Sequence, residues 1–185
     1  MQECVLDKRD MQQEVNIEAD FNSIFNTYYK KVFNYYYYRT NNKSIAEDLT
    51  SGTFEKILCK REQYDSTKAS LEIWIFAIAR NTLKDYFKMM KRHPWESIEE
   101  IVDSISSEQS PEEKALHSEE EQELIEAIMN LNQRERTIVA YRYGAELKNK
   151  EIAQLMGISE KTISKISMRV LKKLRCVLKE GREYE

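Results

Sequence analysis

Apolar residues in the first half of the chain recur at intervals of three and four positions, the spacing of one face of an α-helix. From Phe21 to Tyr36 this spacing predicts a first helix. Polar residues interrupt it at 40–43, and Ser44 with Glu47 three residues later matches a capping box. We therefore expect a second helix that opens at Ser44 and continues through Ile57.

A third helix is predicted after the polar stretch 62–69. Ser70 is able to cap its first turn, and apolar residues recur from there to Phe87. Pro94 limits its C-terminal end, because the residue before a proline avoids the helical conformation. In the first helix, the consecutive tyrosines 35–38 point to every side, so some of these rings are expected to be exposed.

The helical pattern resumes near residue 110. The Ser-Pro-Glu-Glu run at 110–113 combines a capping residue, a proline at the first helical position and an acidic residue at the third. This helix is predicted to end near Leu131. Asn132 and Glu135 repeat the capping-box pattern for the next helix, and Gly144 suits its C-terminal end.

Residues 149–168 carry the most specific local pattern of the chain. The apolar face of a short helix there ends at Gly157, where the chain must turn, and Ser159 is able to cap a second helix with Ile163 on its inner face. The small Ala153 allows the two helices to cross closely. This is similar to the apolar pattern of a helix-turn-helix, whose second helix enters the major groove of DNA. The alternative is an ordinary helical hairpin.

The chain is therefore expected to be all-α, with two small helical domains at 17–92 and 112–180 joined by a linker at 93–111. With only 4 glycines and 2 prolines in 185 residues, an all-β fold is excluded. The longest apolar run, Ile73 to Ala79, is far shorter than the ~20 residues of a membrane span. We expect no membrane insertion and no signal peptide, and hence a cytoplasmic location.

The net charge of −3 conceals a strong asymmetry along the chain. Residues 93–123 carry one lysine against eleven acidic residues, so the linker region is acidic. The range from Lys161 to Arg182 contains eight basic residues and a single acidic residue. A basic stripe on a helix is typical of a surface that contacts a phosphate backbone, although a solvated helix face produces the same composition.

Catalytic and metal chemistry find no support in the sequence. Cys4, Cys59 and Cys176 are far apart and form no C-x-x-C pair, and His93 and His117 are the only histidines. A zinc site or a disulfide framework needs closer and more numerous ligands. The chain also lacks a glycine-rich phosphate loop. We therefore expect no catalytic residues, no metal and no cofactor, and a protein that is not an enzyme.

Two blocks of sequence resemble, in order and spacing, a bacterial RNA polymerase sigma factor of the extracytoplasmic-function (ECF) type. In the first block, 46–54 (AEDLTSGTF) resembles the helix that binds the polymerase clamp, and 73–81 (IWIFAIARN) resembles the promoter-melting helix. In the second block, 131–175 resembles the domain that reads the minus-thirty-five box. The chain departs from the family at Ser51-Gly52, where Gln-Glu is usual, and at Asn132, where proline is usual.

The resemblance implies roles for particular residues of the first domain. Polymerase-clamp binding is expected at Glu47, Asp48, Leu49, Ser51 and Phe54. Minus-ten recognition and melting are expected at Asp65, Ser66, Thr67, Ser70, Trp74, Phe76, Arg80, Asn81, Lys84 and Lys88. For Trp74 and Phe76, packing in the core is the competing interpretation.

In the second domain, the resemblance and the helix-turn-helix register together imply contacts with the minus-thirty-five element. These are expected at Lys150, Ser159, Lys161, Thr162, Ser164, Lys165, Arg169, Lys172 and Lys173. The implied partners are core RNA polymerase, at its clamp and flap, promoter DNA and an anti-sigma factor. The expected function is to direct core polymerase to promoters and to help melt the minus-ten region.

Three alternatives remain open at this point. The chain could be a stand-alone helix-turn-helix regulator with a helical dimerisation domain, which would bind its operator without polymerase. It could be a protein-interaction module such as a sigma antagonist, against which the basic recognition helix argues. Within the family, its size and its lysine-, isoleucine- and asparagine-rich composition also suit a clostridial toxin-gene regulator.

Overall fold

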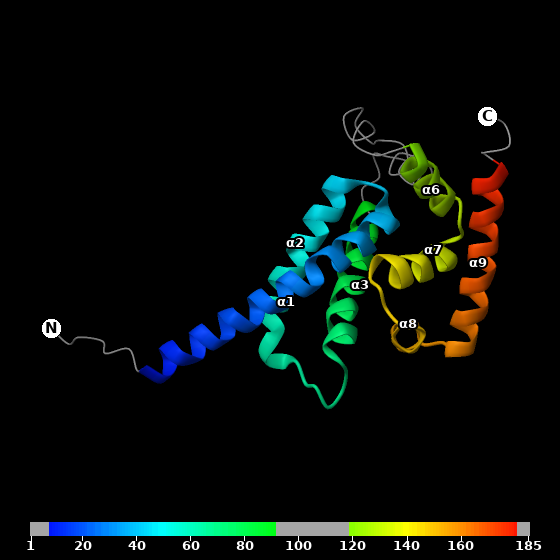
Figure 1. Ribbon diagram of the computed structural model, residues 1–185. Coiled ribbons are helices and arrows are strands. Elements are labelled where there is room, and N and C mark those ends of the chain that lie inside the picture. Colours follow the sequence, from blue (N-terminus) through cyan, green and yellow to red (C-terminus); the bar gives the residue numbers. More distant parts are fainter. Residues whose placement is uncertain (1–7, 92–118, 181–185) are drawn as a thin grey trace.

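A computed structural model describes residues 8–91 and 119–180, with side chains described at 21–91 and 122–178. All regular elements in these ranges are helical, and none is a strand. Figure 1 shows their arrangement. In order they are α1 (Lys8–Thr40), α2 (Lys43–Lys60), η1 (Arg61–Gln63), α3 (Leu71–Met90), α6 (Glu119–Met129), α7 (Gln133–Val139), η2 (Ala140–Gly144), α8 (Asn149–Met156) and α9 (Glu160–Glu180).

The first three helices pack together through one buried tyrosine. The Tyr36 hydroxyl donates to the carbonyl of Ala79 at 2.9 Å and lies 2.5 Å from the Thr53 hydroxyl. Since the phenol has one proton, Thr53 is the donor of the second bond. Burial raises the pKa of Tyr36, because the phenolate would lose its hydration. This residue therefore links α1, α2 and α3.

The turn between α1 and α2 differs from the sequence prediction. Asn42, not Ser44, is the N-cap of α2, and its side chain accepts a hydrogen bond from the Ile45 backbone at 3.0 Å. Asn41 before it has a φ of 50°, a left-handed conformation that asparagine tolerates better than most residues. The N-cap therefore lies two residues earlier than expected, because two consecutive asparagines complete the turn. The predicted caps Ser70 and Asn132 are both confirmed.

The turn between α8 and α9 has the geometry expected of the helix-turn-helix. Gly157 ends α8 with a φ of 67°, and the Ile158 backbone NH donates to the Ala153 carbonyl at 3.1 Å. Side chains with a Cβ are strained in this conformation, which explains the glycine. Ile152 and Leu155 of α8 and Ile163 and Ile166 of α9 are buried, and the two helices are in contact.

The two halves of the chain share one hydrophobic core. The rings of Tyr35 in α1 and Tyr141 in η2 stack with centroids 4.8 Å apart, and both residues are buried. Gly144 does end its helix as predicted, but its φ is not positive. A Cβ at this position would lie 3.0 Å from the backbone carbonyl of Asn34, so glycine allows a closer approach of η2 to α1 than a residue with a side chain does.

The same packing changes the expectation for the four tyrosines of α1. Tyr35 and Tyr36 are buried and Tyr37 and Tyr38 are half-buried, so none of the four is fully exposed. The side of α1 that carries Tyr35 faces the second half of the chain. Among the described residues, no helix is long and apolar enough to cross a membrane. The linker 93–111 and the predicted helix start at 110–113 lie outside the described residues.

Candidate nucleic-acid interface

The N-terminal turns of α9 present a polar surface to solvent. Ser159 caps the helix by accepting a hydrogen bond from the Thr162 backbone at 3.2 Å. Lys161 and Lys165 are exposed, and the predicted contact Lys150 in α8 is exposed as well. Thr162 is half-buried and its hydroxyl lies 2.8 Å from that of Ser159. The first turn of α9 is therefore ordered and accessible, as base readout requires.

Ser164 is held in place by a residue for which the sequence reading had assigned no role. Asn149, the first residue of α8, donates from its side-chain amide to the Ser164 hydroxyl at 2.9 Å. This bond connects the two helices of the motif across their outer edge. Asn149 therefore orients Ser164, a predicted base-contacting residue. The only sequence signal for this role was the position of Asn149 at the start of α8.

Further along α9, two of the residues predicted to contact the minus-thirty-five element bind a buried carboxylate. The Lys173 ammonium donates to both oxygens of Glu135 at 2.8 and 2.9 Å, and Arg169 Nε lies 3.5 Å from the nearer oxygen. Glu135 is 1% exposed and also completes the capping box of α7 through Asn132. One carboxylate therefore fixes the start of α7 and the position of α9 relative to it.

The electrostatics of this cluster follow from that geometry. The hydrogen bonds from Lys173 hold the pKa of the Glu135 carboxyl below its ordinary value, although burial opposes them. The sequence analysis identified Glu135 as a capping residue but not as a partner of α9. A signal was available, because Glu135 lies on the same helical face as the buried residues Ile138 and Val139.

The loop before α3 is preorganised by its own polar side chains. Asp65 accepts from the backbone NH of Thr67 at 2.9 Å and from its hydroxyl at 2.6 Å, and it pairs with Lys68 at 2.9 Å. The hydrogen bond from the Thr67 hydroxyl is the main cause of the lowered pKa of Asp65. Asp65 thus shapes the loop, while Ser66 and Ser70 are exposed.

The aromatic residues predicted for melting are divided between the loop and the core. Trp74 is half-buried, and its ring lies 5.3 Å from that of Tyr64 beside the loop. Phe76 is fully buried and packs edge-on against Tyr35 and Tyr141. A base has no access to Phe76 in this arrangement, which favours the core-packing interpretation for that residue.

The basic row predicted on α3 is exposed. Arg80, Asn81, Lys84 and Lys88 all reach the surface, and three of them follow one another at intervals of four. Arg80 also donates a hydrogen bond to the backbone carbonyl of Leu155 in α8. Arg80 therefore serves as a contact between the two halves in this structure.

The predicted clamp residues of α2 fall into two groups. Glu47, Asp48 and Ser51 are exposed, whereas Leu49 and Phe54 are buried and pack into the core. The exposed three are available to a partner, and the buried two support the helix that carries them. The ring of Phe54 lies 4.9 Å from that of Phe25 in α1.

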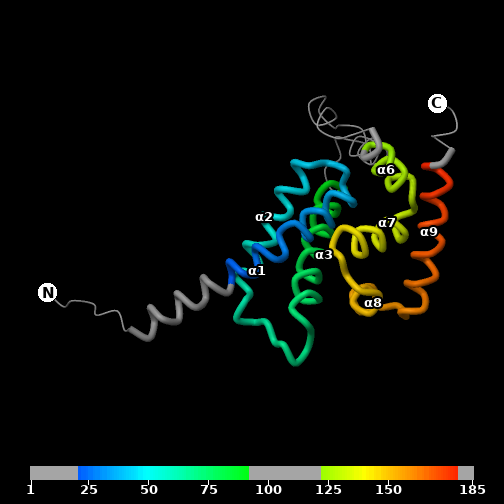
Figure 2. The backbone as a smooth tube through the Cα atoms, in the orientation of Figure 1, coloured from blue at the N-terminus to red at the C-terminus, as the bar shows by residue number. Residues whose placement is uncertain are grey.

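The three predicted sets of residues lie on separate elements and do not form one site. Figure 2 shows α3 and α7 between α2 and α9, which lies at the right of the molecule. The described residues contain no cluster of three or more metal-ligating His, Cys, Asp or Glu side chains. The predicted residues therefore form separate surfaces and not one shared site.

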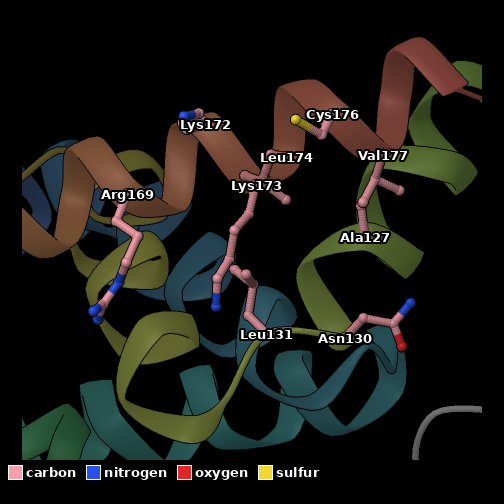
Figure 3. Close-up of a pocket in the computed structure, with 9 residues that line it drawn as sticks. All are labelled: Ala127, Asn130, Leu131, Arg169, Lys172, Lys173, Leu174, Cys176 and Val177. Atoms are coloured by element: carbon pink, nitrogen blue, oxygen red, sulfur yellow. The ribbon is translucent and has the colours of Figure 1, made fainter.

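A groove of about 430 Å³ lies between α6 and α9. Its walls include the apolar side chains of Ala127, Leu131, Leu174 and Val177. Arg169 and Lys173 reach across it from α9, whereas Lys172 points away (Figure 3). The groove is thus an apolar surface with a basic edge on the side of α9.

Comparisons with known proteins agree with the geometry. Sigma-70 region 2 matches residues 24–93, and Sigma-70 region 4 matches residues 127–175. The chain is 32% identical over 162 residues to the ECF RNA polymerase sigma factor BldN of Streptomyces coelicolor, a match that covers 87% of this chain and 61% of that protein. It is 28% identical to the ECF RNA polymerase sigma factor SigM of Bacillus subtilis, over 85% of this chain and 94% of that one.

Among solved structures, the fold is similar to the sigma factor RpoE of Bartonella quintana, crystallised with the anti-sigma factor NepR. The TM-score is 0.63 at 21% identity, over 86% of this chain and 97% of the other. This likeness concerns the fold. Region 2 and region 4 follow one another in the expected order, on the helices that carry the predicted surfaces. The chain belongs to the sigma-70 family and is an RNA polymerase sigma factor of the ECF type.

Proposed function

We propose that this chain binds core RNA polymerase through α2, captures the separated minus-ten strand with α3 and the loop before it, and reads the minus-thirty-five duplex with α9. A sigma factor directs polymerase to promoters and is an initiation factor, not an enzyme. The observation that carries the assignment of surfaces is the order of the two matched regions, each with most of its predicted polar residues exposed. The domain limits 17–92 and 112–180 are part of this proposal.

The clamp contact is proposed for the exposed face of α2. Glu47 and Asp48 are consecutive exposed carboxylates on a helix that Leu49 and Phe54 anchor in the core. Complementary charge across an interface increases the association rate and selects the partner. Gly52 leaves open space next to Ser51, since nothing lies within 4 Å of a Cβ built there.

Strand capture is proposed for the loop 64–70 and the basic row of α3. Unstacking a base costs a few kcal/mol, and stacking or pocket contacts return about 1–3 kcal/mol per base. Ser66 and Ser70 offer exposed hydroxyls for a base edge, and Lys84 and Lys88 offer charge for the phosphates. Binding of the separated strand then shifts the equilibrium toward open DNA without any bond chemistry.

Duplex reading is proposed for the first turns of α9. We expect Lys161, Ser164 and Lys165 to face base edges, and we expect Lys172, which is exposed and points away from the groove, to contact a phosphate. For the polymerase flap, the apolar groove between α6 and α9 is the proposed contact. We also place the protein in the cytoplasm and propose an anti-sigma factor as its regulator, as the family resemblance implies.

The decisive experiment is transcription by purified core polymerase with and without this protein, on a library of genomic fragments. We expect starts at a specific set of promoters only when the protein is present. Stand-alone binding of the free protein to its own operator, with no stimulation at any promoter, would instead establish a helix-turn-helix regulator. The comparisons do not favour that alternative.

A further inference from the structure

One edge of the helix-turn-helix carries a hydrogen bond between its two helices. The side-chain amide of Asn149 donates to the Ser164 hydroxyl at 2.9 Å and so joins the start of α8 to α9. Figure 1 shows α8 beside the orange first turns of α9, and the two helices are in contact. Ser164 is half-buried, whereas Lys161 one turn before it and Met168 one turn after it are exposed. The bond therefore lies next to the exposed face of α9.

The direction of this bond determines what Ser164 offers to a ligand. A hydroxyl has one proton to donate and two lone pairs with which to accept. The amide of Asn149 occupies one lone pair, and none of the described residues accepts the proton. An oxygen that accepts a hydrogen bond is polarised, which strengthens the bond that its own proton donates. Ser164 is thus prepared as a hydrogen-bond donor.

The same pair contributes little to the stability of the fold. The other polar atom of the amide, Asn149 Oδ1, is buried and has no hydrogen-bond partner among the described residues. A buried carbonyl without a partner costs free energy comparable to the contribution of one hydrogen bond. The bond to Ser164 is therefore offset within the same side chain, and its main consequence is the orientation of the hydroxyl.

One turn beyond Ser164, α9 presents an apolar side chain to solvent. Met168 is 73% exposed, more than any other large apolar residue in the described part of the chain. Side chains four positions apart are neighbours on one helical face, with Cβ atoms about 5–6 Å from each other. Methionine is also flexible enough to adapt to an apolar partner. This face of α9 therefore combines one hydroxyl donor with one adaptable apolar group.

One base displays the complement of these two groups. In the major groove, thymine presents the O4 acceptor next to its C5 methyl group, whereas cytosine presents an amino donor and no methyl group. Guanine and adenine present acceptors but no apolar group. A hydroxyl donor and an apolar side chain on adjacent turns of a helix therefore match thymine better than any other base.

We infer that Ser164, oriented by Asn149, and Met168 together read one thymine of the DNA duplex. The reading of a thymine rests on the function proposed above for α9, and it adds the identity of a base and of its two contacts. Asn149 acts through Ser164 and is a positioning residue. Lys161 and Lys165 are exposed on the same turns and provide positive charge beside the contact.

The test uses two analogues that each change one of the two groups of thymine. Deoxyuridine keeps O4 but lacks the methyl group. The analogue 5-methylcytosine, paired with guanine, keeps the methyl group but replaces O4 by an amino donor. Each thymine in the upstream duplex of a promoter is replaced in turn. Affinity is measured for the full chain with core polymerase and, at low salt, for the full chain alone, because low salt strengthens phosphate contacts.

We expect the wild type to distinguish thymine from both analogues at one position. Loss of the O4 acceptor should weaken binding about five- to tenfold, and loss of the methyl group about two- to fourfold. Ser164→Ala should abolish only the first preference and Met168→Ala only the second. Ser164→Thr keeps the hydroxyl and Met168→Leu keeps an apolar group, so each of these variants should retain the corresponding preference.

Asn149 is tested by reversing the direction of its hydrogen bond. In Asn149→Asp the carboxylate accepts the proton of Ser164, which leaves only lone pairs for the base. The added negative charge should weaken binding to every duplex, but the variant should prefer 5-methylcytosine over thymine about two- to fivefold. Asn149→Ala should lower the preference for thymine about threefold without lowering the melting temperature. Gln154→Ala, at an exposed position of α8, is the control and should leave every preference unchanged.

The outcomes separate this inference from the proposed function. Unchanged preferences in Ser164→Ala or in Met168→Ala overturn the reading of thymine. A lower melting temperature in both Asn149 variants, with an unaltered ratio of affinities, overturns the positioning role. If core polymerase adds no affinity for any promoter, the proposed function is wrong, and the measurements on the chain alone still decide the base contact. If binding depends on polymerase but no thymine shows these preferences, the proposed function stands and the thymine contact is wrong.

Discussion

At the residue scale, Glu135 is the side chain whose role changes most between sequence and structure. Its carboxylate binds Lys173 and Arg169 of α9 and caps α7. We expect Glu135→Gln to lower the free energy of unfolding by about 1–2 kcal/mol. This is less than the full contribution of hydrogen bonds to a charged group, because Lys173 is half exposed and solvent screens its charge. Urea titration measures this, with Glu126→Gln, an exposed residue of α6, as the control.

Glu135 also makes stability depend on pH. Its pKa in the folded chain lies below the ordinary 4.5, because Lys173 stabilises the ionised form. The stability it contributes is therefore complete above about pH 4.5 and is lost as the pH falls through the folded value. We expect the wild type to lose more stability than Glu135→Gln between pH 5 and 3. Parallel curves for the two proteins would contradict this.

Substitutions of Lys165 and Lys173 should distinguish a residue that contacts a base from a residue that supports the structure. We expect Lys165→Ala to change sequence preference, since a base contact is worth about 1–3 kcal/mol of discrimination. Lys173→Ala should weaken all promoters similarly, and, because it leaves Glu135 buried without its main partner, it should also lower the melting temperature. Binding to specific and scrambled upstream elements tests the first expectation, and thermal melting the second.

Asp48 provides a test of the clamp contact that is independent of folding. It is exposed on α2, and exposed substitutions usually change the free energy of unfolding by less than about 0.5 kcal/mol. Asp48→Lys should therefore weaken binding to core polymerase while the melting temperature stays nearly constant. Unchanged affinity in a pull-down with core enzyme would remove Asp48 from the site.

At the element scale, two glycines should respond in opposite ways to the same substitution. Gly157→Ala forces a side chain into the left-handed region at a φ of 67° and should destabilise the helix-turn-helix by about 1–2 kcal/mol. Gly52→Ala fills open space within α2 and should stabilise the protein by about 0.5–1 kcal/mol. Chemical unfolding of the two variants beside wild type checks both signs.

Most elements of the fold were predictable because their signals are local. The apolar spacing of α3, the cap at Ser70 and the turn at Gly157 each involve residues a few positions apart. The start of α2 was misplaced because Ser44 and Asn42 are both good caps, and only the preceding turn at Asn41 distinguishes them. The exposed positions of α2 and α9 were predictable in the same way, from the spacing of apolar residues along each helix.

What the sequence could not predict depends on contacts between distant positions. The burial of Tyr35 depends on Tyr141, which lies 106 residues later. Gly144 was interpreted as a helix terminator because its neighbour in space, Asn34, belongs to the other half. The partner of Arg80 in α8 was likewise invisible to local pattern, and the helical face of Glu135 indicated its burial but not its pairing with Lys173. Each of these residues was assigned from its own helix alone.

At the scale of the whole molecule, the shared core makes the two halves one cooperative unit. Because Tyr35, Phe76 and Tyr141 pack together, unfolding either half exposes apolar surface of the other. We expect calorimetry of the wild type to give a single transition with agreement between calorimetric and van't Hoff enthalpies. Gly144→Ala should divide it into two, and a divided transition in wild type would contradict a common core.

The same stacked tyrosines have a consequence for self-association. A chain whose halves separate exposes both Tyr35 in α1 and Tyr141 in η2, and a second copy offers the same pair. The connecting residues 92–118 hold the internal partner at an effective concentration of the order of millimolar, so closure within one chain prevails in dilute solution. Shortening this connection below its necessary reach removes that advantage. Two such chains would then exchange their C-terminal halves and form a domain-swapped dimer, each tyrosine pair being made between molecules.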